Sequence, residues 1–241
     1  MKKIIWLFLS FAVFLTVSAQ AQVYTKPDKA IETITLEGRT VESFVPKGWE
    51  IISRADGDLN GDGLKDAAIS LGLTEDNREM LDTSEDNYES PPYIVAVLFG
   101  KKDGGFKRFA VNGRLYPQYG DAPMSVEIKN GVLVTNQNFR DGWAIDATFR
   151  FRFDAAENKL MLIGFDLEHY SRTSIYEGSK TSENYLTGTR IEYAKSNYKR
   201  KSSLYSETKK SRIERSRISF AEARFNESGD DNDDSDIVRP F

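Results

Sequence analysis

Residues 148–153 read Thr-Phe-Arg-Phe-Arg-Phe, and this alternation of polar and large apolar side chains decides the fold class. Successive side chains of an extended strand point to opposite faces, so the three phenylalanines share one face of a sheet. The same period of two recurs at 125–129. No stretch keeps an apolar period of 3.6 residues over three turns, and only a short helix at 40–44 is expected. The sequence therefore predicts a mainly β protein.

The segments that join these runs predict antiparallel neighbours. Asn130-Gly131 separates two apolar runs, and this dipeptide favours a type I′ hairpin turn, in which both central residues have positive φ. Two further hairpins are expected, one joining 93–99 to 106–111 and one joining 149–153 to 160–165. Three hairpins along the chain predict an antiparallel β-meander.

The first 21 residues have the pattern of a signal peptide. Lys2 and Lys3 precede an apolar run at 4–17, and Ala19-Gln20-Ala21 has the small-x-small spacing of a cleavage site. The apolar run is short for a membrane span, although an uncleaved anchor is the alternative. We therefore expect an exported protein, periplasmic or secreted, that starts at Gln22 and has no transmembrane span after cleavage.

The composition excludes several kinds of chemistry. The 241 residues include no cysteine and one histidine, which excludes disulfides, thiolate zinc sites and cysteine nucleophiles. With 33 basic and 37 acidic residues, the net charge of −4 argues against nucleic acid as a partner.

Charge also divides the mature chain. Residues 22–194 are expected to form one all-β domain, interrupted by a polar excursion at 74–92. Residues 195–241 carry a basic block at 195–217 and an acidic block at 227–236, a pattern typical of a disordered tail. Contact of the basic block with an anionic polymer or membrane surface is the alternative.

The segment at 58–66 carries the clearest chemical signal, because it reads Asp-Leu-Asn-Gly-Asp-Gly-Leu-Lys-Asp. Calcium takes six to eight oxygen ligands, and alternate side chains of a tight loop can converge on one ion. A glycine at the sixth position allows the sharp turn that such a loop needs. Hard oxygen ligands favour Ca²⁺ over zinc or copper. The predicted ligands are Asp58, Asn60, Asp62, the carbonyl oxygen of Leu64, and Asp66. An Asp- and Gly-rich turn without an ion is the alternative.

The context of this loop differs from that of an EF-hand. Position 12 is Ile69 in place of a bidentate glutamate, and 67–71 continues as a strand. The loop resembles the calcium loops of FG-GAP repeats in integrin α-subunit propellers, although one loop does not make a full propeller.

The order of segments adds a second resemblance. The run at 44–51 reads Phe-Val-Pro-Lys-Gly-Trp-Glu-Ile and leads into the loop. With the Lys-Asn-Gly-Val segment at 129–132 and the Leu-Thr-Gly segment at 186–188, it resembles a family of uncharacterised exported bacterial proteins with one calcium-type loop. The resemblance covers roughly 44–191 and implies no particular activity.

These signals predict a structural or binding role, with an envelope protein or a glycan as partner, and no catalytic residues or organic cofactor. Three aromatic residues in or beside the loops that flank the Asn130-Gly131 hairpin, Tyr116, Tyr119 and Trp143, are candidates for such contacts, and capping of the sheet's core is their alternative role. The alternative is a carbohydrate-active hydrolase, which needs two carboxyl groups about 5 to 10 Å apart. Its candidates are carboxylates expected at strand ends, Asp146, Asp154, Asp166 and Glu168, with His169 nearby.

Overall fold

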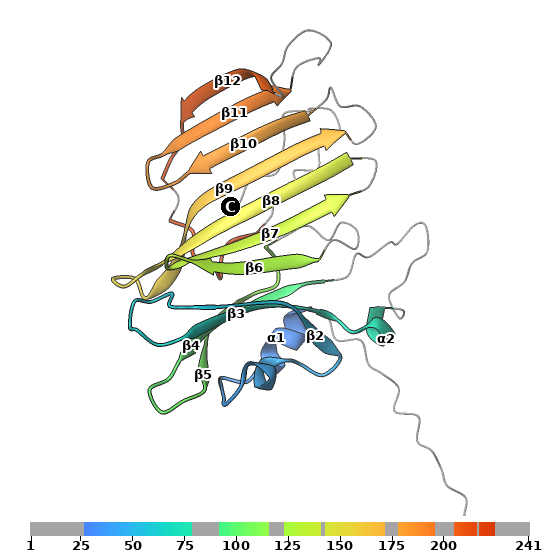
Figure 1. Ribbon diagram of the computed structural model, residues 1–241, viewed down its shortest axis with the longest axis vertical. Helices are drawn as coiled ribbons and strands as arrows, with labels where there is room; N and C mark the ends of the chain where they lie inside the picture. Colours follow the sequence, from blue (N-terminus) through green and yellow to red (C-terminus); the bar gives the residue numbers. More distant parts are fainter. Residues whose placement is uncertain are drawn as a thin grey trace, which may run out of the picture.

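The computed structural model describes residues 27–78, 92–115, 123–140, 143–171, 178–195, 205–215 and 217–224. Two antiparallel sheets follow one another along the longest axis of the molecule (Figure 1). The mainly β, antiparallel fold class predicted from the sequence is confirmed. The predicted signal peptide, most of the polar excursion and the acidic block lie outside the described residues.

The first sheet has five strands in the order β1-β5-β4-β3-β2. Its strands are β1 (Glu37–Gly38), β2 (Trp49–Gly57), β3 (Asp66–Leu73), β4 (Ile94–Gly100) and β5 (Phe106–Asn112). Three short helices accompany it: α1 (Pro27–Thr33), the 3-10 helix η1 (Val41–Phe44) and α2 (Glu75–Arg78). Helix η1 lies where the sequence predicted a short helix.

Strand β3 is buried along its whole length, because both faces of this sheet are covered. Ile69 and Leu71 pack under α1 and η1 with Phe44, whereas Ala68 faces the second sheet. A strand covered on both sides needs apolar residues at consecutive positions, which explains the unbroken apolar character of 67–71.

The second sheet is a continuous meander of seven strands in the order β12-β11-β10-β9-β8-β7-β6. Its strands are β6 (Met124–Lys129), β7 (Val132–Arg140), β8 (Trp143–Asp154), β9 (Lys159–Ser171), β10 (Gly178–Asn184), β11 (Thr189–Lys195) and β12 (Tyr205–Arg212). Asn130 and Gly131 have φ of 52° and 70°, so both central residues of the predicted hairpin turn have positive φ.

The two sheets meet where β6 packs across β2 and β3. Ser70 donates its hydroxyl to the carbonyl oxygen of Met124 at 2.6 Å, and Val126 donates its amide to Ser53 Oγ at 3.2 Å. A single apolar core continues from this junction over the second sheet, with Phe149 at its centre. Phe149 and Phe151 stack with centroids 6.2 Å apart, as their alternation with polar residues predicted.

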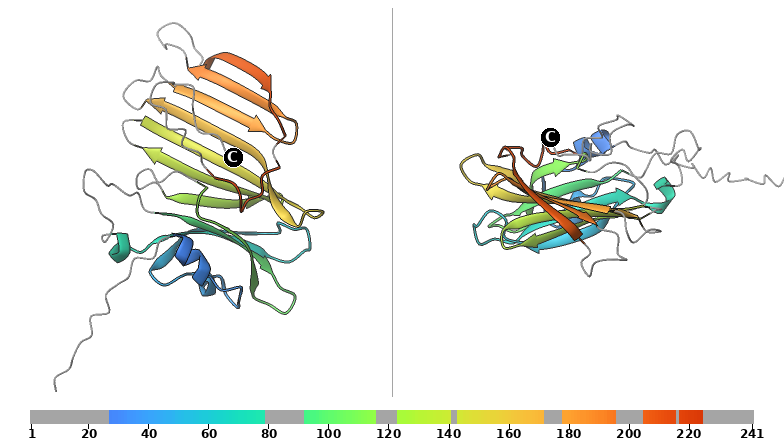
Figure 2. Two further views of the ribbon diagram at one scale, coloured as in Figure 1. Left: turned by 180° about the vertical axis from the view of Figure 1, so that it is seen from behind. Right: turned by 90° about the horizontal axis from the view of Figure 1, so that it is seen from above.

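The fold extends beyond the boundary predicted at residue 195. β12 pairs with β11, and residues 217–224 lie against the second sheet (Figure 2). Phe220 donates its amide to the carbonyl oxygen of Leu160 at 2.7 Å and places its ring in the core, 1% exposed. Charge blocks did not reveal these segments, because a strand at a sheet edge and one buried phenylalanine need little apolar sequence.

Candidate functional site

The predicted calcium loop connects β2 to β3 at one end of the first sheet, where the β6–β7 turn also lies (Figure 1). Leu59 is 3% exposed and belongs to the core shared by the two sheets, so it anchors the loop from within. Asp58, Asn60 and Leu64 are half-buried, and Asp62 is exposed. The loop therefore combines one apolar anchor with a polar side open to solvent.

The carboxylate of Asp58 accepts two hydrogen bonds from backbone amides of the loop. One oxygen accepts a hydrogen bond from the Gly61 amide at 2.7 Å, and the other accepts one from the Gly63 amide at 3.0 Å. Gly61 and Gly63 have φ of 76° and 80°, a region that favours glycine, and no atom lies within 4 Å of a Cβ built on either residue. Backbone conformation, rather than crowding, thus requires glycine at these two positions.

Asn60 and Asp62 repeat this pattern in the second half of the loop. Asn60 Oδ1 accepts the amide hydrogen of Asp62 at 3.0 Å, and Asp62 Oδ1 accepts that of Leu64 at 2.8 Å. Asn60 Nδ2 also donates to Asp62 Oδ2 at 3.0 Å. Each oxygen has two lone pairs, so an amide hydrogen bond leaves acceptor capacity for a cation.

Asp66 lies at the base of the loop and is fully buried. Its two oxygens accept hydrogen bonds from the backbone amides of Leu59 at 2.8 Å and Gly100 at 2.9 Å. Burial raises the pKa of Asp66, the two amide contacts oppose this, and the negative charges of Asp62 and Asp58 raise it further. Asp66 therefore holds the loop to the end of β4, a role that the sequence motif does not reveal.

Two glycines outside the loop allow the close approach of these segments. A Cβ on Gly100 would lie 2.5 Å from the carbonyl oxygen of Lys65, and a Cβ on Gly57 would lie 2.4 Å from Ile128 Cγ2 on β6. The loop thus lies where the ends of β2, β3, β4 and β6 come together.

Within the described ranges, no three His, Cys, Asp or Glu side chains are grouped in a way that could hold a metal ion. The loop oxygens of Asp58 and Asp62 are turned to loop amides, and Asp66 is turned to the interior. The assignment of Asp58, Asn60, Asp62, Leu64 and Asp66 as ligands therefore stays a prediction.

No family model matches the chain, and no curated protein matches it. The predicted resemblance to exported bacterial proteins and to FG-GAP loops thus receives no test from these comparisons.

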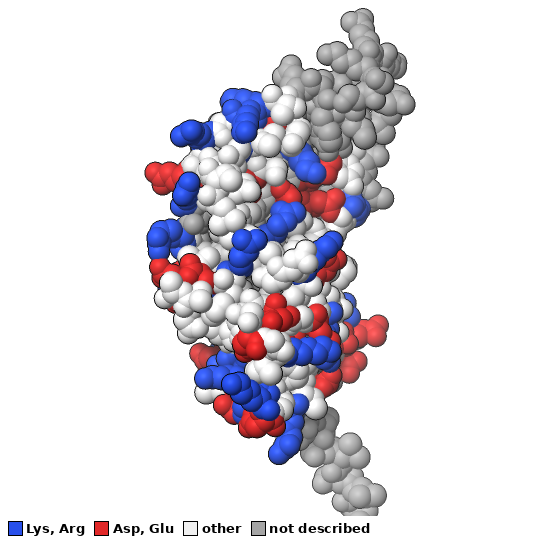
Figure 3. Space-filling model, turned by 60° about the vertical axis from the view of Figure 1, so that its left-hand side comes forward, with Lys and Arg blue, Asp and Glu red and all other residues white. Residues whose placement is uncertain are grey.

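Basic and acidic side chains are interspersed over the face that Figure 3 shows. Among the described helices, none is both long and apolar enough to span a membrane.

The carboxylates of the hydrolase alternative do not lie at strand ends, with one exception. Asp146, Asp166 and Glu168 lie within β8 and β9, and only Asp154 ends a strand, where it accepts the amides of Ala156 and Glu157. The register places Asp146 directly opposite Glu168 on the polar face of the second sheet.

Basic side chains accompany each carboxylate on this face. Arg150 lies 2.6 Å from Asp166, Arg140 lies 3.3 Å from Asp146, and Lys180 lies 3.9 Å from Glu168. Paired in this way, the carboxylates form a cross-strand ladder of ions, and the hydrolase alternative stays a prediction.

Asp146 nevertheless gives this face a testable pH dependence. Burial raises its pKa, Arg140 opposes the shift, and Glu168 adds to it. Because the folded-state pKa is raised, protonation of Asp146 stabilises the folded protein. This stabilisation is complete below the unfolded-state pKa and is lost as pH rises through the folded-state pKa. We expect Asp146→Asn to increase the free energy of unfolding at pH 7 and to have a smaller effect near pH 3.5.

Urea unfolding of both proteins at the two pH values measures this difference. Asp166→Asn, which removes the 2.6 Å pair to Arg150, is the matched control and should lower stability at pH 7. A loss of stability at pH 7 in Asp146→Asn would show that its ion pair outweighs its burial.

Sequence reasoning missed a buried ion pair between β10 and β11. Glu183 and Arg190 are cross-strand partners with side chains only 4% and 15% exposed, and Arg190 Nε donates to Glu183 at 2.6 Å. The hydroxyl of Tyr185, itself in the core, also donates to Glu183. Nothing in the local sequence indicates this pair, because it depends on the register of the two strands.

Proposed function

We propose that the chain is a calcium-binding β domain that acts outside the cytoplasm in a structural or binding role. The observation that carries this proposal is the loop at 58–66. Four of its residues have side-chain oxygen atoms, and its two glycines have positive φ. The repulsion that Asp58 and Asp62 exert on Asp66 supports it, because a divalent cation would offset this excess of negative charge.

An ion at this place would stabilise the junction between the sheets. Asp66 contacts the end of β4 through Gly100, and the carbonyl oxygen of Asp58 lies 3.8 Å from the Cβ position of Gly131 in the β6–β7 turn. Ordering the loop would therefore fix the ends of both sheets relative to each other. Export, predicted from residues 1–21, would place the loop where calcium is abundant.

We predict that calcium raises the unfolding temperature of the mature chain. An ion that binds only the folded loop adds RT ln(1 + [L]/Kd), about 2.7 kcal/mol at a hundredfold excess over Kd. For a domain of this size, that corresponds to an increase of about 5 to 10 °C. Thermal melts in millimolar calcium and in chelator, with calorimetric titration of Ca²⁺, measure the effect.

Asp62→Ala should abolish the calcium increment and leave the melt in chelator nearly unchanged, because Asp62 is exposed. Asp103→Ala is the matched control, since Asp103 is an exposed acidic residue of the β4–β5 turn and lies outside the loop. Equal melting temperatures of the wild type in calcium and chelator, with no heat of binding, would refute the metal assignment.

A further inference from the structure

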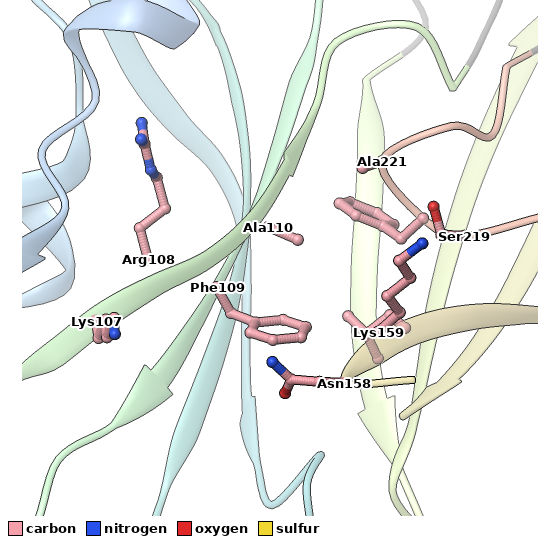
Figure 4. Close-up of a pocket in the computed structure, with 10 residues that line it drawn as sticks. Lys107, Arg108, Phe109, Ala110, Asn158, Lys159, Ser219 and Ala221 are labelled. Atoms are coloured by element: carbon pink, nitrogen blue, oxygen red, sulfur yellow. The ribbon is translucent and has the colours of Figure 1, made fainter. Parts of the chain in front are cut away.

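A pocket of about 350 Å³ lies between β5, the β8–β9 turn and the segment at 217–224 (Figure 4). It is separate from the calcium loop and from the ladder of ions on the second sheet. Its apolar lining comes from Phe109, Ala110, Leu160, Phe220 and Ala221. A volume of this size is at the lower end of the range for small-molecule sites.

The apolar wall is built around a cluster of three aromatic rings. Phe109 stacks on Phe99 with centroids 4.0 Å apart, and Phe153 meets both rings edge-on at 5.6 and 5.7 Å. All three rings are only partly buried, although they pack against the core. Since Phe99 and Phe153 support Phe109, its ring offers a fixed apolar surface to the pocket.

The opposite wall supplies a positive charge and an amide. In Figure 4, Lys159 extends along this wall toward Ser219, and the amide of Asn158 is directed toward Phe109. Asn158 has φ of 50°, in the left-handed region, and lies in the β8–β9 turn. Lys159 forms no ion pair with any residue of the described chain, whereas Arg108 donates to the carbonyl oxygens of Ile31 and Ile34. Lys159 is therefore the cation of this wall that is available to a ligand, and Lys107 of β5 also lines the pocket.

One acidic group lies near this cation. Glu222 accepts hydrogen bonds from the amide of Ser219 at 3.1 Å and from its hydroxyl at 2.5 Å. These contacts lower the pKa of Glu222, and the charge of Lys159 adds to the effect. Glu222 is thus an ionised neighbour that is held by Ser219, and it competes with an anionic ligand for Lys159.

We infer that this pocket binds a small amphiphilic anion, with its apolar part against Phe109 and its carboxylate at Lys159 and Asn158. An apolar wall together with Lys107 and Lys159, neither of which forms a direct ion pair within the described ranges, favours this class over a sugar, which needs several polar partners, and over a cation. The inference does not depend on calcium, so failure of one proposal leaves the other standing.

Nuclear magnetic resonance titration with 4-phenylbutyrate, 4-phenylbutanol and 4-phenylbutylamine tests this inference. These probes share an apolar part and differ in charge. We expect 4-phenylbutyrate to bind with a Kd on the order of 1 mM, because ligands of this size gain little free energy per atom. Shifts should appear at Ala110 and Leu160, and the amine should bind at least about threefold more weakly.

Three variants locate the charge effect. Lys159→Met should weaken binding of 4-phenylbutyrate about three- to fivefold and leave the alcohol unaffected. Glu222→Gln should strengthen binding of the acid, because a competing charge is removed. Lys102 is an exposed lysine of the neighbouring β4–β5 turn, so Lys102→Met is the control and should leave binding of all three probes unchanged. Equal binding of all three probes, or the absence of shifts at Ala110 and Leu160, would overturn the inference.

Discussion

Asp66→Ala is expected to lower the free energy of unfolding by up to about 6 kcal/mol, in chelator as well as in calcium. The substitution leaves the buried amide of Leu59 and the partly buried amide of Gly100 without an acceptor, and a buried unsatisfied group costs about 1 to 3 kcal/mol. Relief of the repulsion from Asp58 and Asp62 offsets part of this loss. Urea unfolding in both conditions measures the change.

Two further variants separate the role of Asp66 in holding the loop from its role as a metal ligand. Asp66→Asn keeps one carbonyl oxygen as acceptor, so its stability in chelator should lie between those of the wild type and Asp66→Ala. Asp62→Ala is the matched control, because it removes a loop carboxylate without leaving a buried amide unsatisfied. Wild-type stability of Asp66→Ala in chelator would contradict the proposed role of these two hydrogen bonds.

The second large effect is expected at the buried ion pair of the second sheet. Arg190→Met leaves the carboxylate of Glu183, 4% exposed, with the hydroxyl of Tyr185 as its remaining donor among the described residues. Removal of one partner from a buried pair costs about 3 to 5 kcal/mol, because the other charge stays buried. We expect this loss in urea unfolding at pH 7.

A double variant and a surface control test the explanation. Arg190→Met combined with Glu183→Met should recover most of the lost stability, since no buried charge remains. Lys209→Met removes the exposed partner of Glu192, 3.8 Å away, and should cost less than about 1 kcal/mol. If Arg190→Met costs no more than Lys209→Met, the pair is not buried in solution.

Around the loop, some features are determined by the local sequence and others by tertiary contacts. The motif at 58–66 predicts which residues offer oxygen atoms and where glycine is required, because both depend on positions within nine residues. It does not reveal that Asp66 holds Gly100, 34 residues away, or that Gly57 must admit Ile128 from β6. Such contacts arise only when the strands take their places.

The sequence by itself determined the mainly β fold, the hairpin at Asn130-Gly131 and the loop between two strands, because side-chain alternation and turn conformation are local properties. Tertiary structure decided the pairing of Asp146 with Glu168, the burial of Glu183 with Arg190, and the inclusion of 205–215 and 217–224 in the fold. The pocket at Lys159 belongs to this second group, since β5, the β8–β9 turn and the segment at 217–224 meet only in the folded chain. The physical reason is that strand register and burial are set by the packing of distant segments, which no local pattern records.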